Sequence, residues 1–316
     1  MKSTFPNEPH HPSEFTRKDW WQILVRLYEK TIDDNLSLVA AGVALYFLLA
    51  LFPMVAALVS LFGILVSSAE LNQHMASVVA FLPQESRYLI QEQIESIVTK
   101  ENSTLGIGFA LSLTLAIWSG GKGSAALMTA CNITYGESPK RSFLVNIVLR
   151  FVFTVSALLL VILALFLITV FPVLIAYISS IEMTESRAKW LSWPILTLTF
   201  NFALAALYRY APSRKNAKWR WVTPGSSLAT VLWIVASYAF TIYVTEFAQY
   251  NETYGSIGGV IVLIMWFYMS AYVILIGAEV NSVMEMQTLG DSTVGEAKPI
   301  GKRGAFVADH KAEQKE

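Results

Sequence analysis

Two ionisable side chains stand out because each lies inside a long apolar run of the chain. Lys122 lies in the run from Leu105 to Met128, and Glu279 lies near the end of the run from Ser256 to Val280. A charge in the hydrocarbon core of a membrane is costly, so it needs a partner, water or a functional role. Because both residues fall at similar depth, we predict that Lys122 and Glu279 form an ion pair, with Arg209 as the alternative partner of Glu279.

Together with Asn281, these residues predict a substrate or ion pathway through Lys122, Glu279, Asn281 and Arg209. A fixed ion pair that only sets the order of the helices is the alternative interpretation of the same residues. Ser119 lies one helical turn before Lys122, so a Ser/Lys dyad is the residual enzymatic option. Such spacing is easily obtained by chance, and a lysine that extends toward the membrane surface explains Lys122 better.

Other residue types argue against an enzyme. All five aspartates lie outside the apolar runs, and so do the four histidines, none of which has metal-ligand spacing with another: His10, His11, His74 and His310. The glycine-rich stretch from Ser119 to Ser124 lacks the first glycine and the final Ser or Thr of a phosphate-binding loop. We therefore expect no enzymatic activity, no catalytic residues, no metal site and no cofactor.

The elements that position these residues are apolar runs long enough to cross a membrane, which takes about 20 helical residues. Hydrophobic residues make up 54% of the 316-residue chain and charged residues 15%, and the mean hydropathy is +0.50. There are six such runs: Leu36 to Val66, Leu105 to Met128, Phe143 to Ile178, Trp190 to Tyr208, Val222 to Thr245 and Ser256 to Val280. Pro53 lies well inside the first run and predicts a kink or a break there. We therefore predict an all-α polytopic membrane protein with six transmembrane helices.

The cations are placed unevenly around these runs. The segments that share a side with the N-terminus contain seventeen Lys and Arg residues, whereas the opposite loops contain four. Because Lys and Arg accumulate on the cytoplasmic side, both termini are predicted to be cytoplasmic. The predicted organisation is a cytoplasmic N-terminal segment (1–35), a six-helix membrane domain (36–284) and a flexible cytoplasmic tail (285–316).

Three segments outside the runs have a readable pattern. Apolar residues of the N-terminal segment share one helical face, which is typical of a helix lying in the membrane interface: Trp20, Trp21, Leu24, Leu27 and Tyr28. The outer loop predicts two short amphipathic helices that meet at Pro83. The basic and aromatic loop at 209–221 favours contact with anionic lipid headgroups over stacking on RNA. We therefore expect the lipid bilayer, but no nucleic acid, as a partner.

Small residues recur every four positions in the second run and again at the start of the sixth, a spacing that lets helices approach closely in lipid. We predict helix packing at Gly108, Ser112, Ala116, Gly120, Ser124, Gly255 and Gly259. A groove that opens along this ridge is the alternative interpretation. The same ridge would also permit a homo-oligomer.

Several motifs occur in order along the chain. They are AAGVALYFLLALFP (Ala40 to Pro53), the stretch from Trp118 to Gly136 that ends in NITYG, LYRYAP (Leu207 to Pro212), WRWVTPG (Trp219 to Gly225), YNETYGSIGG (Tyr250 to Gly259) and GAEVN (Gly277 to Asn281). In these motifs the chain resembles the YihY/BrkB family of bacterial inner-membrane proteins.

The resemblance implies six membrane helices with both termini cytoplasmic, in agreement with the charge pattern. The family has carried ribonuclease, serum-resistance and transport descriptions, and it implies no catalytic residues for this chain. We expect a transporter or translocator of a small or lipidic substrate. The alternative is a membrane scaffold that binds an unknown protein partner, and a membrane-associated ribonuclease is a third, disfavoured interpretation.

Overall fold

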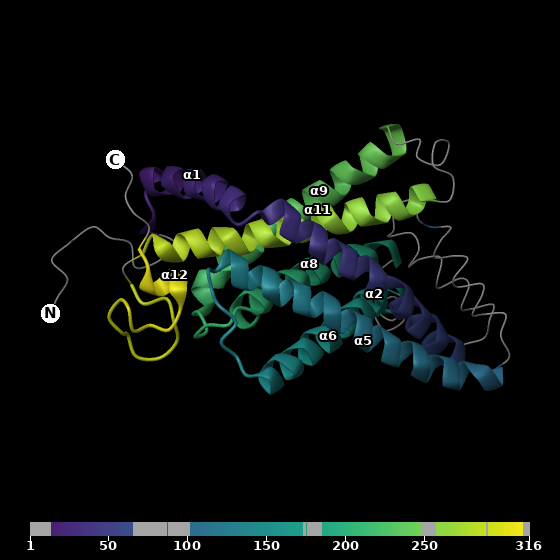
Figure 1. Ribbon diagram of the computed structural model, residues 1–316. Coiled ribbons are helices and arrows are strands. Elements are labelled where there is room, and N and C mark those ends of the chain that lie inside the picture. Colours follow the sequence, from purple (N-terminus) through teal and green to yellow (C-terminus); the bar gives the residue numbers. More distant parts are fainter. Residues whose placement is uncertain are drawn as a thin grey trace.

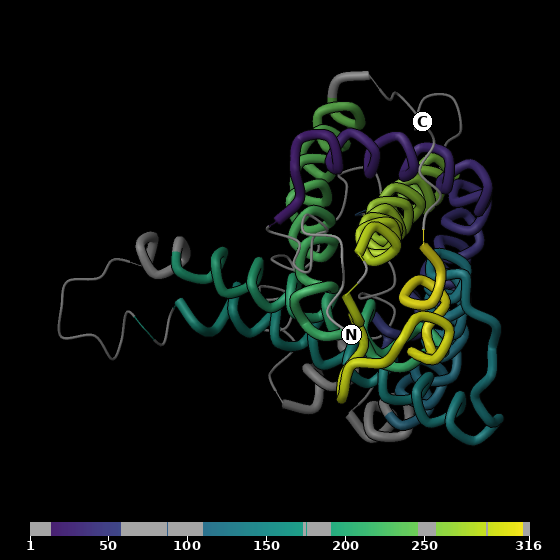
Figure 2. The backbone as a smooth tube through the Cα atoms, turned by 90° about the vertical axis from the view of Figure 1, so that its left-hand side faces the viewer, coloured from purple at the N-terminus to yellow at the C-terminus, as the bar shows by residue number. Residues whose placement is uncertain are grey.

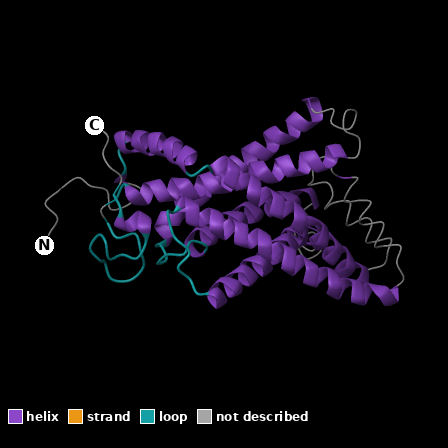
Figure 3. Cartoon of the chain, in the orientation of Figure 1, coloured by secondary structure: helices purple, strands orange, loops and turns teal. Residues whose placement is uncertain are grey.

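The computed structural model describes residues 14–65, 87, 102–172, 175, 185–247, 257–288 and 290–311. Side chains are outside this description at 58–65, 102–109, 185–190 and 246–247. Within the described ranges the chain is helical (Figure 3), and the sole β pairing is an isolated bridge between Ala217 and Thr293. The all-α prediction is confirmed.

Eight α-helices are described in chain order. They are α1 (Arg17–Asp33), α2 (Leu36–Leu65), α5 (Asn102–Thr134), α6 (Phe143–Leu165), α8 (Glu185–Tyr210), α9 (Trp219–Phe247), α11 (Ile257–Met286) and α12 (Phe306–Asp309). A short π-helical segment, η3 (Phe166–Val170), continues α6 directly.

Five of these helices are long and apolar enough to cross a membrane. Their candidate spans are Leu36–Ala57, Phe143–Val170, Leu191–Tyr210, Trp219–Thr245 and Ile257–Met286. The protein is therefore a polytopic helical membrane protein. The second predicted run lies in α5, whose first residues are described as backbone only, so the count of six and the orientation stay predictions.

The helices form one bundle around α11 (Figure 2). α9 packs on one side of α11 and α2 on another, while α5 packs against α2 and α6 against α5. α11 is the most deeply buried of the five candidate spans, as expected of a helix that is apolar on all sides. It contacts α1, α2, α5, α9 and α12, and contacts on several sides explain why it shows no amphipathic pattern.

One end of the bundle carries α1, α12 and the loop 211–218 (Figure 1), and we call it the basic end. α1 begins with a capping box, in which the Thr16 and Asp19 side chains each bond the other's backbone N–H. α1 packs against α11 and buries Ile23, while Trp21 and Tyr28 stay exposed. This exposed aromatic face is the one that the sequence predicts for the membrane interface.

The segment 290–311 packs against the basic end, which differs from the loose tail expected from residue 285. Its backbone pairs with the loop after α8: Val294 N–H donates to the Asn216 carbonyl at 3.0 Å, and Lys218 N–H to the Ser292 carbonyl at 2.8 Å. The polar composition that suggests disorder instead supplies side chains that bond backbone groups within the segment. α11 itself continues to Met286.

α2 continues through Pro53 without a break, and a kink there stays a prediction. The predicted helices of the outer loop, around Pro83, lie outside the described residues. Gly255 and the packing of Gly108 also lie outside them.

Candidate functional site

Three motifs that are separate in the sequence, LYRYAP, WRWVTPG and GAEVN, meet near the basic end, where Asn281 joins two of them. Asn281 is fully buried in α11. Its Oδ1 accepts a hydrogen bond from Gly225 N–H at 2.8 Å, and its Nδ2 donates to the Val222 carbonyl at 3.0 Å. These two backbone groups flank Pro224, which has no N–H to donate. Asn281, predicted as a pathway residue, thus fixes the first turns of α9 to α11.

Two glycines allow this close crossing of α9 and α11. A Cβ atom at Gly225 would lie 2.1 Å from the Gly277 carbonyl oxygen, and one at Gly277 would lie 2.7 Å from the Gly225 carbonyl oxygen. The Tyr208 hydroxyl donates to the Ile274 carbonyl at 2.6 Å in the same contact. The backbones therefore touch directly, and only glycine fits at either position.

Glu279 is fully buried between α11 and α1. The Nζ atom of Lys30 lies 3.0 Å from Oε2 of Glu279, and Lys30 also pairs with Asp34. In addition, Lys30 donates to the Thr134 carbonyl at the end of α5, at 2.7 Å. One lysine thus links the ends of α1, α5 and α11.

The predicted pair of Lys122 with Glu279 is wrong. The Lys122 ammonium lies over the Trp118 ring, 3.9 Å from its centroid, and the alternative partner Arg209 lies over the Trp219 ring at 4.6 Å. The partner of Glu279 comes from α1, because this helix crosses over α11 and brings a cation into the bundle.

A second buried ion pair, Arg214 with Glu285, was missed by the sequence analysis. Both side chains are completely buried, and the two guanidinium NH groups donate to the two carboxylate oxygens at 2.9 and 2.8 Å. Ser292 from the C-terminal segment donates to the same carboxylate at 2.7 Å, and the guanidinium lies over the Tyr135 ring. Burial lowers the pKa of Arg214, but the Glu285 carboxylate outweighs it, so that the pKa is raised.

The loop 209–221 is less available to lipid headgroups than its composition indicates. Arg214 and Trp221 are buried, and Lys218 donates to the Asp291 carbonyl. Arg141 donates to the carbonyls of residues 210, 211 and 212, which follow or end α8. These cations mainly stabilise the end of a helix and a docked segment.

The docked C-terminal segment depends on carboxylates outside the membrane. Glu137 accepts a bond from Phe306 N–H at 2.5 Å, and burial of Glu137 raises its pKa despite this bond. Asp309 accepts bonds from the N–H groups of Gly301, Arg303 and Gly304. Partial burial raises the pKa of Asp309, but these bonds outweigh it and the net shift is downward.

Two residues of the predicted small-residue ridge, Gly120 and Ser124, contact α6. A Cβ at Gly120 would lie 2.9 Å from a methyl carbon of Thr154 in α6, and the Ser124 hydroxyl lies 2.9 Å from the Thr154 hydroxyl. Ala116 is buried as well. The Ser119 hydroxyl donates to the Leu115 carbonyl of its own helix at 2.7 Å, which does not fit a nucleophile held toward Lys122.

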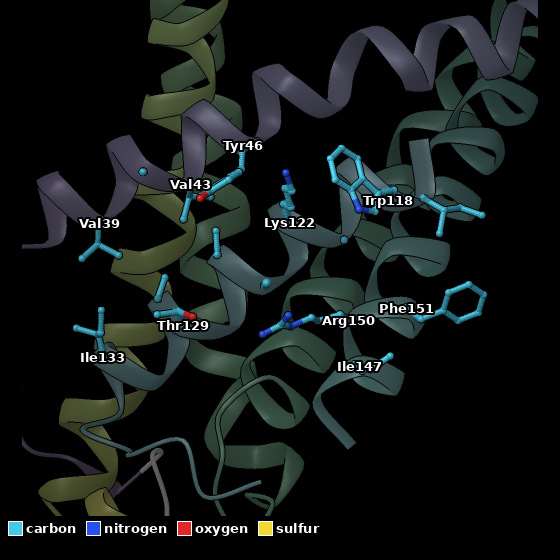
Figure 4. Close-up of a pocket in the computed structure, with 16 residues that line it drawn as sticks. Val39, Val43, Tyr46, Trp118, Lys122, Thr129, Ile133, Ile147, Arg150 and Phe151 are labelled. Carbon is cyan, nitrogen blue, oxygen red and sulfur yellow. The ribbon is translucent and has the colours of Figure 1, made fainter. Parts of the chain in front are cut away.

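A groove of about 750 Å³ opens between α2, α5 and α6, and 16 residues line it (Figure 4). Lys122 projects into it from α5, and Arg150 from α6 (Figure 4). The lining is otherwise mostly apolar, and its rim includes Trp118 and Phe151, which are 63% and 54% exposed. The groove is therefore open at the surface of the bundle, beside the candidate spans in α2 and α6.

The glycines of this groove differ from those of the α9–α11 crossing. In the described part of the chain, no atom of another element lies within 4 Å of a Cβ built on Gly42 or on Gly121, and both residues line the groove. Helix packing therefore does not require glycine at either position. A glycine inside a helix costs up to about 1 kcal/mol relative to alanine.

The cations of the groove also differ from those of the basic end. No described carboxylate forms an ion pair with Lys122 or Arg150, and the Arg150 side chain has no hydrogen-bond partner among the described residues. The described residues contain no group of three or more His, Cys, Asp or Glu that could hold a metal ion.

Three relatives are similar over most of this chain. The Bacillus subtilis protein YfkH, whose name describes it as ribonuclease-like, is 31% identical over 78% of this chain and 88% of its own length. A UPF0761 membrane protein from Idiomarina loihiensis is 26% identical over 68% of this chain and 72% of its own length. One from Aeromonas salmonicida is 25% identical over 90% of this chain and 96% of its own length. No solved structure matches this chain.

The family model described as Virulence factor BrkB matches residues 27–300. This match includes the groove, the buried ion pairs and the first half of the C-terminal segment. The chain therefore belongs to the Virulence factor BrkB family, which is a family of membrane proteins.

Proposed function

We propose that this protein translocates a lipidic substrate, and that the substrate binds in the groove between α2, α5 and α6. The observation that carries the proposal is a mostly apolar groove of about 750 Å³ at the surface of the bundle. Helix packing does not require glycine at Gly42 or Gly121, and the space that these two residues leave open in the groove favours a ligand site.

The proposed setting is a bacterial inner membrane with both termini and the basic end in the cytoplasm. Seventeen cations on this side of the chain, against four on the other, support that orientation. In this arrangement Lys122 belongs to the substrate pathway. Glu279 and Asn281 form part of the fixed frame on which the groove helices are held, because each already has a polar partner in the bundle. Arg209 lies over the Trp219 ring and does not line the groove, so we assign it to the frame as well.

The proposal can be tested with the full chain in vesicles of phosphatidylethanolamine and phosphatidylglycerol that contain a trace of head-labelled fluorescent lipid. A quencher added outside bleaches only the label in the outer leaflet. We expect the protein to move inner-leaflet label outward, so that a slow second phase of bleaching follows the fast loss of the outer-leaflet label and proceeds toward completion. Gly121→Leu, which places a side chain in the groove, should slow this second phase.

The matched control is Val235→Leu, which enlarges an exposed apolar residue on α9 away from the groove. It should leave the rate unchanged. Inner-leaflet label that stays protected in every sample would contradict the proposal and favour the scaffold interpretation.

A further inference from the structure

We propose that the groove binds an anionic phospholipid, with Lys122 and Arg150 on its phosphate and with its acyl chains along the apolar walls. This inference rests on the proposed function and names the substrate class of the same groove.

The first argument is charge. Buried Arg214 and half-buried Lys30 each have a carboxylate partner at 3.0 Å or less. Lys122 and Arg150 are exposed at the groove and have none among the described residues, although both lie within helices of the bundle. A cation inside a membrane needs a counter-charge. Because the described protein supplies none here, the missing charge belongs to a ligand.

The second argument is the direction in which Lys122 points. Lys122 lies twelve residues before the end of α5, or about 18 Å from the basic end at about 1.5 Å per residue. Its ammonium rests on Trp118, which is one turn farther from the basic end. A lysine that simply extended to the nearer membrane surface would point the other way. Lys122 is instead held in the groove.

Arg150 lies nearer the basic end, seven residues into α6 or about 11 Å from the start of this helix. The two cations therefore occupy two depths along one groove (Figure 4). A guanidinium binds phosphate oxygens through paired N–H donors, whereas an ammonium acts as a point charge. A phosphate that enters at Arg150 can pass to Lys122 without losing a cationic partner.

The third argument distinguishes a lipid from a soluble anion. Apart from the two cations, the walls are mostly apolar, and exposed Trp118 and Phe151 open the groove toward acyl chains. A free phosphate uses only the cations, whereas an anionic phospholipid uses both the cations and the walls. Open space beside Gly42 and Gly121 leaves room for a chain.

Native mass spectrometry on the full chain in a neutral detergent tests this inference. Phosphatidylglycerol and phosphatidylcholine with the same acyl chains are the two probes. We expect phosphatidylglycerol to bind about tenfold more tightly, and Lys122→Gln and Arg150→Gln each to reduce its affinity about tenfold, as for loss of a charged hydrogen bond. Phosphatidylcholine binding should not change in these variants.

Three further variants make the result specific. Arg150→Lys and Lys122→Arg keep a cation in the groove and should retain most of the preference for phosphatidylglycerol. Lys302→Gln removes an exposed cation outside the groove and should have no effect. Each variant is first compared with the parent protein by its thermal unfolding midpoint, so that loss of fold is not read as loss of a ligand.

Equal affinities for the two lipids, or the same loss in Lys302→Gln, would overturn the inference. Inorganic phosphate that competes as strongly as the lipid would assign the site to a soluble anion instead. Binding that depends on the two cations, without lipid movement in vesicles, would contradict the proposed function but support this inference. If labelled phosphatidylcholine and phosphatidylglycerol move at the same rate, and neither charge variant changes that rate, the proposed function is supported and this inference is contradicted.

Discussion

At the basic end, the buried side chains of Arg214, Glu285 and Glu279 each have an opposite charge beside them, whereas the cations of the groove have none among the described residues. Arg214 and Glu285 form a two-bond pair, and Glu279 pairs with Lys30. Lys122 has only an aromatic ring beside it, and Arg150 has no partner in the described part of the chain. Cations therefore differ in role between the two regions. At the basic end they hold helices together through ion pairs, and in the groove they have no carboxylate partner among the described residues.

The glycines of the two regions differ in the same way. At the crossing of α9 and α11, Gly225 and Gly277 bring two backbones into contact. In the groove, Gly42 and Gly121 have open space where a side chain would be. In the first region a glycine makes room for a neighbouring backbone, and in the second it leaves open the space in which we propose a ligand binds.

The largest expected effect is that of Gly277→Ala. The added Cβ would lie 2.5 Å from the Tyr208 hydroxyl and 2.7 Å from Ala229, and neither α9 nor α11 can shift without losing the Asn281 bonds. We expect a loss of about 4 kcal/mol or more in the free energy of unfolding, or a protein that fails to accumulate. Thermal unfolding in detergent measures it. An unfolding midpoint equal to that of the parent would contradict the direct contact of the two helices.

Glu285→Met is expected to rank next. It leaves the buried Arg214 guanidinium without its carboxylate, and breaking a buried ion pair in this way costs about 3–5 kcal/mol. The double variant Arg214→Met/Glu285→Met removes both charges and should recover much of the loss. If the double variant is no more stable than the single one, the cost is one of packing rather than of charge.

Asp309→Asn should have a smaller and local effect, because it weakens the bonds from the N–H groups of Gly301, Arg303 and Gly304. We expect about 1–3 kcal/mol less protection of the C-terminal segment. Hydrogen exchange of residues 290–311 measures this protection, and Lys302→Gln is the matched control.

Docking of this segment should also depend on pH. The pKa of Asp309 is lowered below its ordinary value of 3.8, so its contribution is present above that value and is lost as the pH falls through the lowered pKa. The pKa of Asp291 is lowered as well, so its contribution to docking is also lost as the pH falls. The pKa of Glu137 is raised, so its contribution to the pH dependence has the opposite sign. The protection factors of this segment, which correct for the intrinsic pH dependence of amide exchange, should therefore fall in the acidic range in the parent protein and change less in Asp309→Asn. An equal change in both would assign the effect to other groups.

Gly121→Ala is expected to have the smallest effect on stability. Because open space surrounds this position, the substitution should stabilise the fold by up to about 1 kcal/mol through helix propensity. Gly277→Ala is expected to destabilise the fold, so the same substitution should have opposite effects on stability at the two positions. Destabilisation of Gly121→Ala by more than this amount would show that the groove is packed like the basic end.

The helical architecture could be predicted from the sequence because it depends on local runs of apolar residues. The five candidate spans fall within the predicted runs or overlap them closely, and charge placement along the chain marks one end of the bundle as basic. The recurrence of small residues every four positions also predicted that Gly120 lies on a packing face, since that spacing defines one face of a helix. In the structure this position contacts Thr154.

The partners of the buried charges could not be predicted. Glu279 was recognised as costly, but Lys30 reaches it only because α1 crosses over α11, which no local pattern encodes. Arg214 lies in a basic loop and Glu285 at the start of a polar segment, so composition predicts neither to be buried. Arg150 is a single cation in the apolar run from Phe143 to Ile178, and no local pattern shows that it lines a groove with Lys122.

The most direct test of the account maps where an anionic lipid touches the protein. Phosphatidylglycerol with a photoreactive acyl chain is crosslinked to the full chain in vesicles, and the labelled peptides are identified by mass spectrometry. We predict adducts concentrated at residues 117–129 and 147–151 and reduced by Arg150→Gln. Adducts of equal density on the exposed apolar face of α9, at Val231, Val235 and Tyr238, and unchanged in Arg150→Gln, would contradict the account.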